Sequence, residues 1–281
     1  MTTGQSNHPL ETLGPFHPPK VDRQAIKPSV ARRITIKVSD PLDHEAPAIL
    51  HEPRSYNAAG PTGSAVVLVS GAGGGVSGPA GIYPSLADKI ALLLSVPCVR
   101  LDYREPAQTE YCVADMRASF DYLADRFGAT RFVVVGWSFG GSPCFTVAAQ
   151  EPTRVCGVAT VASQTANTQG VRALAPRPLL LLHGEDDHVL APSCSKTLFN
   201  QYGAGGDREM RLFPGDDHGL TRHAPEVERK IFVFAARCLG LSELVNHEVL
   251  LQVGQDLVGG REGRVKEMEM GRDLDGGERL F

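Results

Sequence analysis

Two patterns of hydrophobic positions divide the chain. Near its start apolar and polar residues alternate, and Ile34, Ile36 and Val38 are separated by polar side chains. This alternation predicts a strand with one buried face, and residues 48–51 are suited to a second strand of the same hairpin. From Ser64 onward the apolar runs are short and continuous, which is typical of strands buried on both faces of a parallel sheet.

The continuous runs alternate with amphipathic stretches of helical length. Strands are predicted at residues 65–69, 96–101, 131–135, 155–162, 178–182 and 209–213, and helices at 84–95, 110–127, 141–150, 192–202 and 225–239. Regular strand–helix alternation favours right-handed crossover connections. The predicted fold class is α/β: a three-layer α/β/α sandwich with a mostly parallel, mixed sheet of about eight strands, and the opening hairpin at one edge.

Both ends of the chain lack this pattern. Residues 1–30 are rich in Pro, His and Gly, and we interpret them as an irregular N-terminal arm. The folded domain is predicted to span residues 31–245. Residues 246–281 form a charged, Gly-rich C-terminal tail, with the alternative of one more helix at 244–257.

Composition excludes several classes of protein. The chain has 281 residues, 42% hydrophobic and 21% charged, with a formal net charge of −4. This is globular composition without the basic balance of nucleic-acid binders, and no apolar run approaches the ~18 residues of a membrane helix. The six cysteines are scattered without a C-x-x-C pair, so we expect buried thiols in a reducing, cytoplasmic setting. The expected partner is a small-molecule substrate, not nucleic acid or membrane.

The segment RFVVVGWSFGG, residues 131–141, is the most informative stretch. A buried strand runs directly into Gly136-Trp137-Ser138-Phe139-Gly140, which has the G-x-S-x-G spacing of a nucleophile elbow. A sharp turn that raises Ser138 above the sheet edge brings the residues two before and two after it together, so both must lack a Cβ. The spacing therefore predicts a nucleophilic hydroxyl at Ser138 that is lifted above the sheet edge.

With this motif, residues 33–239 resemble the α/β-hydrolase superfamily, and its compact dienelactone-hydrolase-like branch more than the lipases. That resemblance implies a catalytic triad in the order nucleophile, acid, histidine. In LLLLHGEDDHVLAP the family register selects Asp187 as the acid, with Asp186 as the alternative. In FPGDDHGL it selects His218. A histidine of ordinary pKa can take the serine proton and return it to the leaving group, while the carboxylate fixes the imidazole tautomer.

The resemblance also implies an oxyanion hole. One donor would be the backbone N–H of Phe139, directly after the nucleophile. The other would come from the Gly-rich loop after the strand ending at Val69, where the family register gives Ala72, with Gly73 as the close alternative. Ser70 stands where the family more often has a histidine.

The predicted function is a serine hydrolase acting on a small carboxylic ester, lactone or thioester through an acyl-enzyme, with no cofactor and no metal. Only residues 163–176 separate the sixth strand from the acid-bearing strand, which leaves no room for the cap found in lipases. Dienelactone hydrolases use a cysteine nucleophile, so Ser138 argues against dienelactone itself as the substrate. The alternatives are a non-hydrolytic triad-dependent isomerase, cyclase or dehydratase, or a catalytically silent binding module.

Two further interpretations are weaker. Residues 73–78 have the spacing G-x-G-x-x-G and Asp102 ends the next strand, as in a dinucleotide-binding fold, but Pro79 and Gly81 interrupt the helix that should follow. A metal cluster at residues 183–188 would need neighbouring turn residues to converge. We interpret Trp137 as a core residue and Arg104 as a partner of a nearby acid.

Overall fold

The computed structural model describes residues 30–39, 44–53, 63–203 and 205–255. Residues 1–29 of the predicted arm and 256–281 of the predicted tail lie outside these ranges. The boundaries of the three predicted regions therefore stay predictions, although residues 246–255 of the predicted tail are described and contain a short helix.

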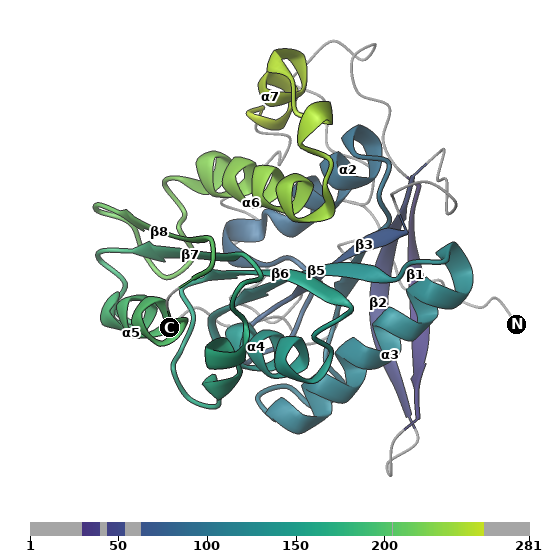
Figure 1. Ribbon diagram of the computed structural model, residues 1–281, viewed down its shortest axis with the longest axis horizontal. Coiled ribbons are helices and arrows are strands. Elements are labelled where there is room, and N and C mark those ends of the chain that lie inside the picture. Colours follow the sequence, from purple (N-terminus) through teal and green to yellow (C-terminus); the bar gives the residue numbers. More distant parts are fainter. Residues whose placement is uncertain (1–29, 40–43, 54–62, 204, 256–281) are drawn as a thin grey trace, which may run out of the picture.

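An eight-stranded mixed sheet forms the centre of the molecule (Figure 1). Its strands are β1 (Val30–Val38), β2 (His44–Glu52), β3 (Ser64–Val69), β4 (Cys98–Leu101), β5 (Arg131–Trp137), β6 (Val155–Val161), β7 (Leu179–Gly184) and β8 (Arg208–Phe213). Their order is β1-β2-β4-β3-β5-β6-β7-β8. The β1–β2 and β2–β4 pairs are antiparallel and the others are parallel, so the predicted edge hairpin and parallel body are confirmed.

Helices cover both faces of the sheet. Its helices are α2 (Tyr83–Leu93), α3 (Thr109–Phe127), α4 (Gly141–Gln150), α5 (Ser193–Gln201), α6 (Ala224–Leu239) and α7 (His247–Val253), with 3₁₀ turns η1 (Pro79–Gly81), η2 (Ser138–Gly140), η3 (Gln169–Ala173) and η4 (Ser242–Leu244). In Figure 1, α2, α6 and α7 lie on one face and α3, α4 and α5 on the other. The five predicted helices are confirmed, with ends within two residues of prediction.

The continuous apolar strands inside the sheet are buried on both sides, as their pattern predicts, but the prediction is wrong for β8, which lies at the sheet edge and is mostly half-buried. All six residues of β3 are buried. Val66 and Leu68 belong to the core beneath α2 and α6, whereas Val67 and Val69 belong to the core beneath α3 and α4. Because alternate side chains of a strand point to opposite faces, one short run supplies two hydrophobic cores.

The six cysteines are all free thiols. Cys98, Cys112, Cys144 and Cys238 are buried, while the prediction of burial is wrong for Cys156 and Cys194, which are half-buried. Burial raises the pKa of each of the six thiols, so none is primed as a thiolate nucleophile.

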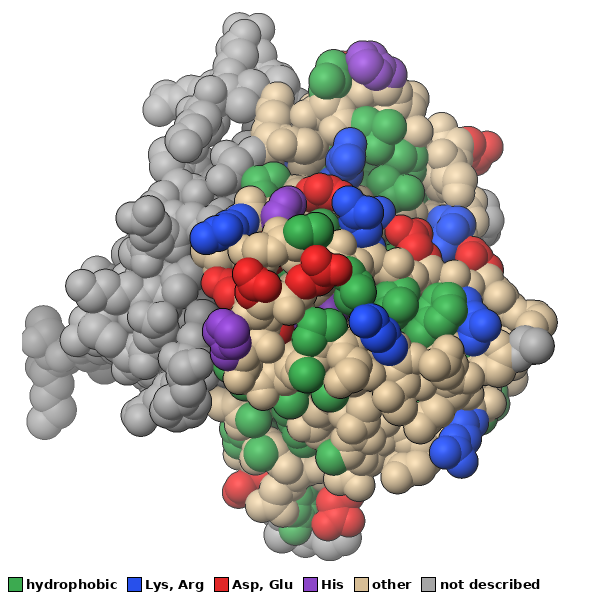
Figure 2. All heavy atoms as spheres, turned by 90° about the vertical axis from the view of Figure 1, so that its left-hand side faces the viewer, with side chains coloured by type: hydrophobic (Ala, Val, Ile, Leu, Met, Phe, Trp, Pro, Cys, Tyr) green, Lys and Arg blue, Asp and Glu red, His purple; other side chains and the backbone are tan. Residues whose placement is uncertain are grey.

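Strand β8 is an open edge of the sheet, and its face carries charges of both signs interspersed with small hydrophobic areas (Figure 2). Glu209 of β8 binds Lys230 at 2.9 Å, and Asp207 binds Arg237 of α6 at 3.1 Å. Charged side chains on an edge strand disfavour pairing with a further strand. No helix in the described ranges is long and apolar enough to cross a membrane.

A buried ion pair joins three helices on the α6 face. Lys89 of α2 and Glu228 of α6 are fully buried and 2.8 Å apart. Lys89 Nζ also donates to the carbonyl oxygens of Val253 and Gln255, at 2.9 and 2.8 Å. Ser85 Oγ donates to Glu228 Oε1 at 2.6 Å. A buried ammonium needs such a set of acceptors, and here the set fixes the end of α7 onto α2.

We expect Lys89→Ala to lower the free energy of unfolding by about 3–5 kcal/mol, because it leaves a buried carboxylate without its cation. The double variant Lys89→Met/Glu228→Leu should recover part of that loss, since it removes both charges and keeps apolar volume. Urea unfolding of the two variants and the native protein measures this. A double variant no more stable than Lys89→Ala would contradict the account.

Candidate active site

The turn after β5 has the geometry that its glycines predict. Ser138 begins η2 with a φ of +56°, a left-handed conformation that is costly for a residue with a Cβ. A Cβ on Gly136 would overlap the carbonyl group of Gly140, and a Cβ on Gly140 would lie 2.5 Å from Ser70 O. The turn can therefore close only with glycine at both positions. It raises Ser138, which is 7% exposed, to the carboxyl edge of the sheet.

Asp187 lies in the loop after β7 and is held by four donors. Its Oδ1 accepts the backbone N–H groups of Val189 and Leu190, both at 2.8 Å. Its Oδ2 lies 2.7 Å from His218 Nδ1 and 3.1 Å from His183 Nε2. The alternative acid, Asp186, is exposed, and its backbone N–H donates to the carbonyl of Asp216 at 3.0 Å. The structure thus pairs Asp187 with the predicted histidine.

Asp187 is ionised at any ordinary pH. Burial alone would raise its pKa, but the hydrogen bonds from His183, His218 and the N–H of Leu190 outweigh that effect and hold the pKa of the carboxyl well below its usual range. The site consequently holds a fixed anion against His218 Nδ1.

The loop after β8 places His218 against the serine turn. Trp137, the residue before Ser138, donates its indole N–H to the carbonyl of His218 at 3.1 Å, and the two rings are 5.7 Å apart. Trp137 is fully buried, as its core interpretation predicts. Among the described residues no hydrogen bond joins Ser138 Oγ to His218. The two residues nevertheless share one edge of the sheet, and their loops are joined by Trp137.

The loop after β3 approaches the same turn from the other side. Tyr103 donates its hydroxyl to Ser70 O at 3.2 Å and packs edge-on against Phe139, with ring centroids 5.9 Å apart. Ala72 is exposed and Gly73 half-buried, and neither N–H donates a backbone hydrogen bond within the described ranges. The predicted donors Ala72 and Gly73 therefore lie on a loop whose first residue, Ser70, packs against the turn that carries Ser138 and Phe139.

The comparisons with known proteins concern the fold. A family model described as the alpha/beta hydrolase fold matches residues 64–180. The structure of Est1E from Butyrivibrio proteoclasticus superimposes with a TM-score of 0.61 at 15% identity, covering 74% of this chain and 99% of that chain. This chain has the α/β-hydrolase fold. The predicted fold class is thereby confirmed.

Two further solved structures share the α/β-hydrolase fold with this chain. Dienelactone hydrolase from Anabaena variabilis gives a TM-score of 0.58 at 16% identity, covering 72% of this chain and 96% of that chain. A serine hydrolase without lid from Xanthomonas campestris gives 0.53 at 12%, covering 75% and 96%. No curated protein sequence matches the chain.

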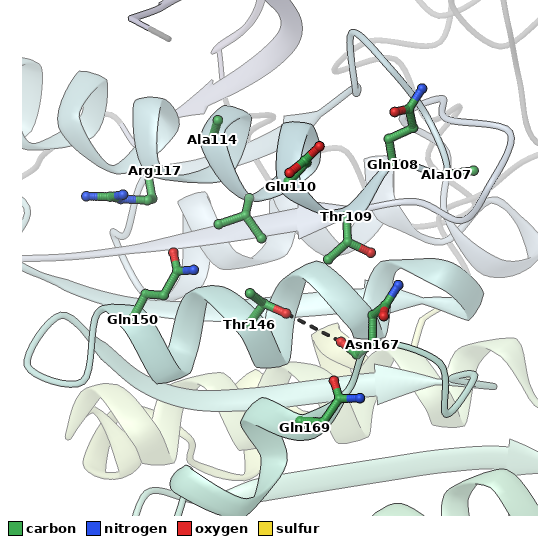
Figure 3. Close-up of a pocket in the computed structure, with 11 residues that line it drawn as sticks. Ala107, Gln108, Thr109, Glu110, Ala114, Arg117, Thr146, Gln150, Asn167 and Gln169 are labelled. Carbon is green, nitrogen blue, oxygen red and sulfur yellow. Dashed lines mark hydrogen bonds between the residues drawn. The ribbon is translucent and has the colours of Figure 1, made fainter. Parts of the chain in front are cut away.

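A groove of about 730 Å³ lies between α3 and α4 of this α/β-hydrolase fold (Figure 3). One end is formed by loop residues that include Gln108, Thr109 and Asn167, and Thr146 of α4 donates to Asn167 O at 3.4 Å. Mostly neutral polar side chains line it, and Ser138 does not. The groove is therefore formed by α3, α4 and the loops after β4 and β6.

Sequence reasoning missed the carboxylates that shape the histidine loop of this α/β-hydrolase fold. Asp216 is buried and accepts the backbone N–H groups of Asp217, Arg222 and His223, at 3.0–3.1 Å. Asp217 Oδ1 accepts the N–H groups of Gly219 and Thr221. The signal was the Asp-Asp pair directly before His218, because Asp side chains commonly cap nearby backbone N–H groups in turns.

His183 has a larger part in this α/β-hydrolase site than the sequence indicated. It is fully buried, its Nδ1 lies 2.7 Å from Ser195 Oγ, and its Nε2 lies 2.8 Å from Leu190 O. A carbonyl only accepts, so Nε2 carries the proton and can also face Asp187. His183 therefore supports the turn that carries the acid and also contacts the acid itself.

The remaining interpretations have definite outcomes. Arg104 forms a buried ion pair with Asp115 at 2.8 Å, as predicted. The G-x-G-x-x-G segment is followed by η1 and not by the start of a helix, and Asp102 binds the backbone N–H of Gly75. In the described part of the chain no three His, Cys, Asp or Glu residues could hold a metal ion.

We expect the Tm difference between native protein and Asp187→Asn to shrink as the pH falls below about 4. A carboxyl whose folded-state pKa is depressed contributes stability above its unfolded pKa of ~3.9 and loses it as the pH falls towards the folded-state value. Thermal melts from pH 7 to pH 2 test this. Asp186→Asn, which changes an exposed neighbour, is the control, and a constant difference for Asp187→Asn would contradict the assignment.

Proposed function

We propose that this chain is a serine hydrolase that cleaves a small carboxylic ester, lactone or thioester through an acyl-enzyme intermediate. The observation that carries the proposal is the 2.7 Å contact between Asp187 Oδ2 and His218 Nδ1. It leaves Nε2 of the same imidazole as a proton acceptor, beside a strained turn that presents Ser138. An ionised acid, an oriented imidazole and a raised serine are the parts that acyl transfer needs.

In the first half-reaction Ser138 Oγ bonds to the substrate carbonyl carbon, its proton passes to His218 Nε2, and an electron pair moves onto the carbonyl oxygen. The N–H groups of Phe139 and of Ala72, or Gly73 in its place, stabilise that oxyanion. Collapse of the intermediate breaks the bond to the leaving group, which takes the proton from His218. Water then repeats the sequence on the acyl-enzyme and releases the acid.

The Ser138–His218 hydrogen bond that this sequence requires is expected to form when substrate is bound, because catalytic hydrogen bonds are often long in empty sites. Asp187 is suited to its part for a separate reason. Its depressed pKa keeps it anionic while His218 becomes cationic, so it stabilises the imidazolium without taking the proton.

The segment after β6 supports a small substrate. It spans residues 162–178 and contains only the five-residue 3₁₀ turn η3, where capped relatives of the fold carry a helical insertion. The serine hydrolase without lid from Xanthomonas campestris shares this fold. An open edge of this kind suits compact esters and thioesters better than long lipids.

We expect a fluorophosphonate probe to label the native protein at Ser138 and to leave Ser138→Ala unlabelled. Ser163→Ala is the matched control, because Ser163 is a buried serine close to the same turn whose hydroxyl only donates to Gln164 O; it should label normally. Intact-protein mass spectrometry measures the adduct. Absence of labelling in folded native protein would contradict the proposal and favour a non-hydrolytic reaction or a binding role.

Asp187→Asn and Asp186→Asn should separate the two candidate acids. We expect Asp187→Asn to lower kcat on 4-nitrophenyl acetate by about 10⁴-fold, since the amide no longer holds the required imidazole tautomer. Asp186→Asn alters an exposed side chain and should stay within about threefold of native. Steady-state kinetics measures both. Comparable losses in the two variants would remove Asp187 from the proposed triad.

A further inference from the structure

The loop that carries the proposed second oxyanion donor is held by Arg100 of β4 and by Asp102, the residue directly after that strand. Gly75 N–H donates to Asp102 Oδ1 at 2.7 Å, and Val76 O accepts from an Arg100 guanidinium N–H at 3.1 Å. Arg100 and Asp102 are two residues apart, so they lie on the same side of the strand. Both anchors act within four residues of Ala72, on backbone groups that no strand or helix fixes.

Asp102 packs against two glycines of the loop. Gly74 has a φ of +76° and Gly75 a φ of +87°. A Cβ on Gly74 would lie 2.7 Å from Asp102 Oδ1, so the backbone can approach the carboxylate only without a side chain. Asp102 itself is buried, with 7% of its surface exposed. The hydrogen bond between Gly75 and Asp102 is therefore buried and closely packed.

A second pair of side chains, His51 and Asp88, fixes the position of Arg100. Its Nε donates to His51 Nε2 at 3.0 Å, and His51 Nδ1 lies 2.7 Å from Asp88 Oδ1. Arginine only donates, so His51 Nε2 accepts and the imidazole proton is on Nδ1, facing the carboxylate. Arg100 and His51 are almost fully buried. One chain of hydrogen bonds thus runs from α2 through β2 and β4 to the loop.

We propose that Asp102 and Arg100 are positioning residues of the oxyanion hole, and that His51 and Asp88 hold Arg100 in place. This inference rests on the proposed serine hydrolase function. Donors to a developing oxyanion act only within narrow limits of distance and angle, whereas substrate in its ground state depends on them little. Loosening the loop should therefore reduce kcat more than it raises KM.

Asp102→Ala and Asp102→Asn form the test pair. We expect Asp102→Ala to lower kcat on 4-nitrophenyl acetate by about 10- to 100-fold with KM within about threefold, because the Gly75 N–H loses its acceptor. Asp102→Asn keeps an acceptor oxygen and should recover to within about threefold of native. A phenylboronic acid inhibitor forms a tetrahedral adduct that carries the oxyanion charge. Its Ki should rise by the same factor by which kcat/KM falls.

Equal losses in both Asp102 variants, or an unchanged Ki beside a reduced kcat, would overturn the inference. Glu228→Gln controls for stability, since Glu228 is equally buried but binds Ser85 and Lys89; its Tm should fall while kcat does not. If Asp102→Ala fails to fold, Arg100→Lys decides: a reduced kcat with unchanged KM supports the inference, and an unchanged kcat overturns it.

Failure of this inference differs visibly from failure of the proposed function. Suppose that fluorophosphonate labels the native protein, that this protein hydrolyses the ester, and that Asp102→Ala has the same kcat and Ki. The hydrolase proposal is then supported and the positioning role of Asp102 is contradicted. If the folded native protein is neither labelled nor active, the hydrolase proposal is contradicted, and so is the positioning role that rests on it.

Discussion

The contact between the backbones of Gly136 and Gly140 is the constraint on which the site depends. Any Cβ at Gly136 would overlap Gly140, so the chain can reverse at the end of β5 only in this tight form. The reversal places Ser138 in a left-handed conformation that isolated chains avoid, and the packed sheet on either side holds it there. Once that turn is closed, β5 must be a central strand, because neighbours on both sides are needed to hold it.

A common device shapes the loops around that turn. Each of three loops is built on a buried aspartate that accepts backbone N–H groups: Asp102 serves the loop after β3, Asp187 the loop after β7, and Asp216 the loop after β8. A carboxylate satisfies several donors at once in a place where water is scarce. Of the three, Asp187 also faces the imidazole, so in this loop the structural device and the proposed chemistry use one side chain.

Much of the fold could be predicted because burial on two faces leaves a clear trace in sequence. The run that becomes β3 is apolar at nearly every position, and the helices that cover it carry the complementary period. The G-x-S-x-G spacing also has a steric cause that can be stated without a structure. The 3₁₀ turns left no such trace, because η1 and η3 are short and contain residues common in any loop.

The contacts among polar residues were harder to foresee. His183 and Ser195 are brought together by the return of α5 onto β7, and His51 meets Arg100 only because β2 pairs with β4. Such partners are far apart in sequence and depend on strand order, which a local pattern does not contain. The choice between Asp186 and Asp187 is of the same kind, since two adjacent acids in a turn differ only in what each one faces.

Adjacent residues of α2 hold two different parts of the structure. Asp88 holds the hydrogen-bond chain that leads to the loop after β3, and Lys89 holds the last turn of α7 together with Glu228. If α7 detached, the buried ammonium of Lys89 would lose two of its carbonyl acceptors. We therefore expect α7 and α2 to open to amide hydrogen exchange together, as one unit that includes the residue next to Asp88.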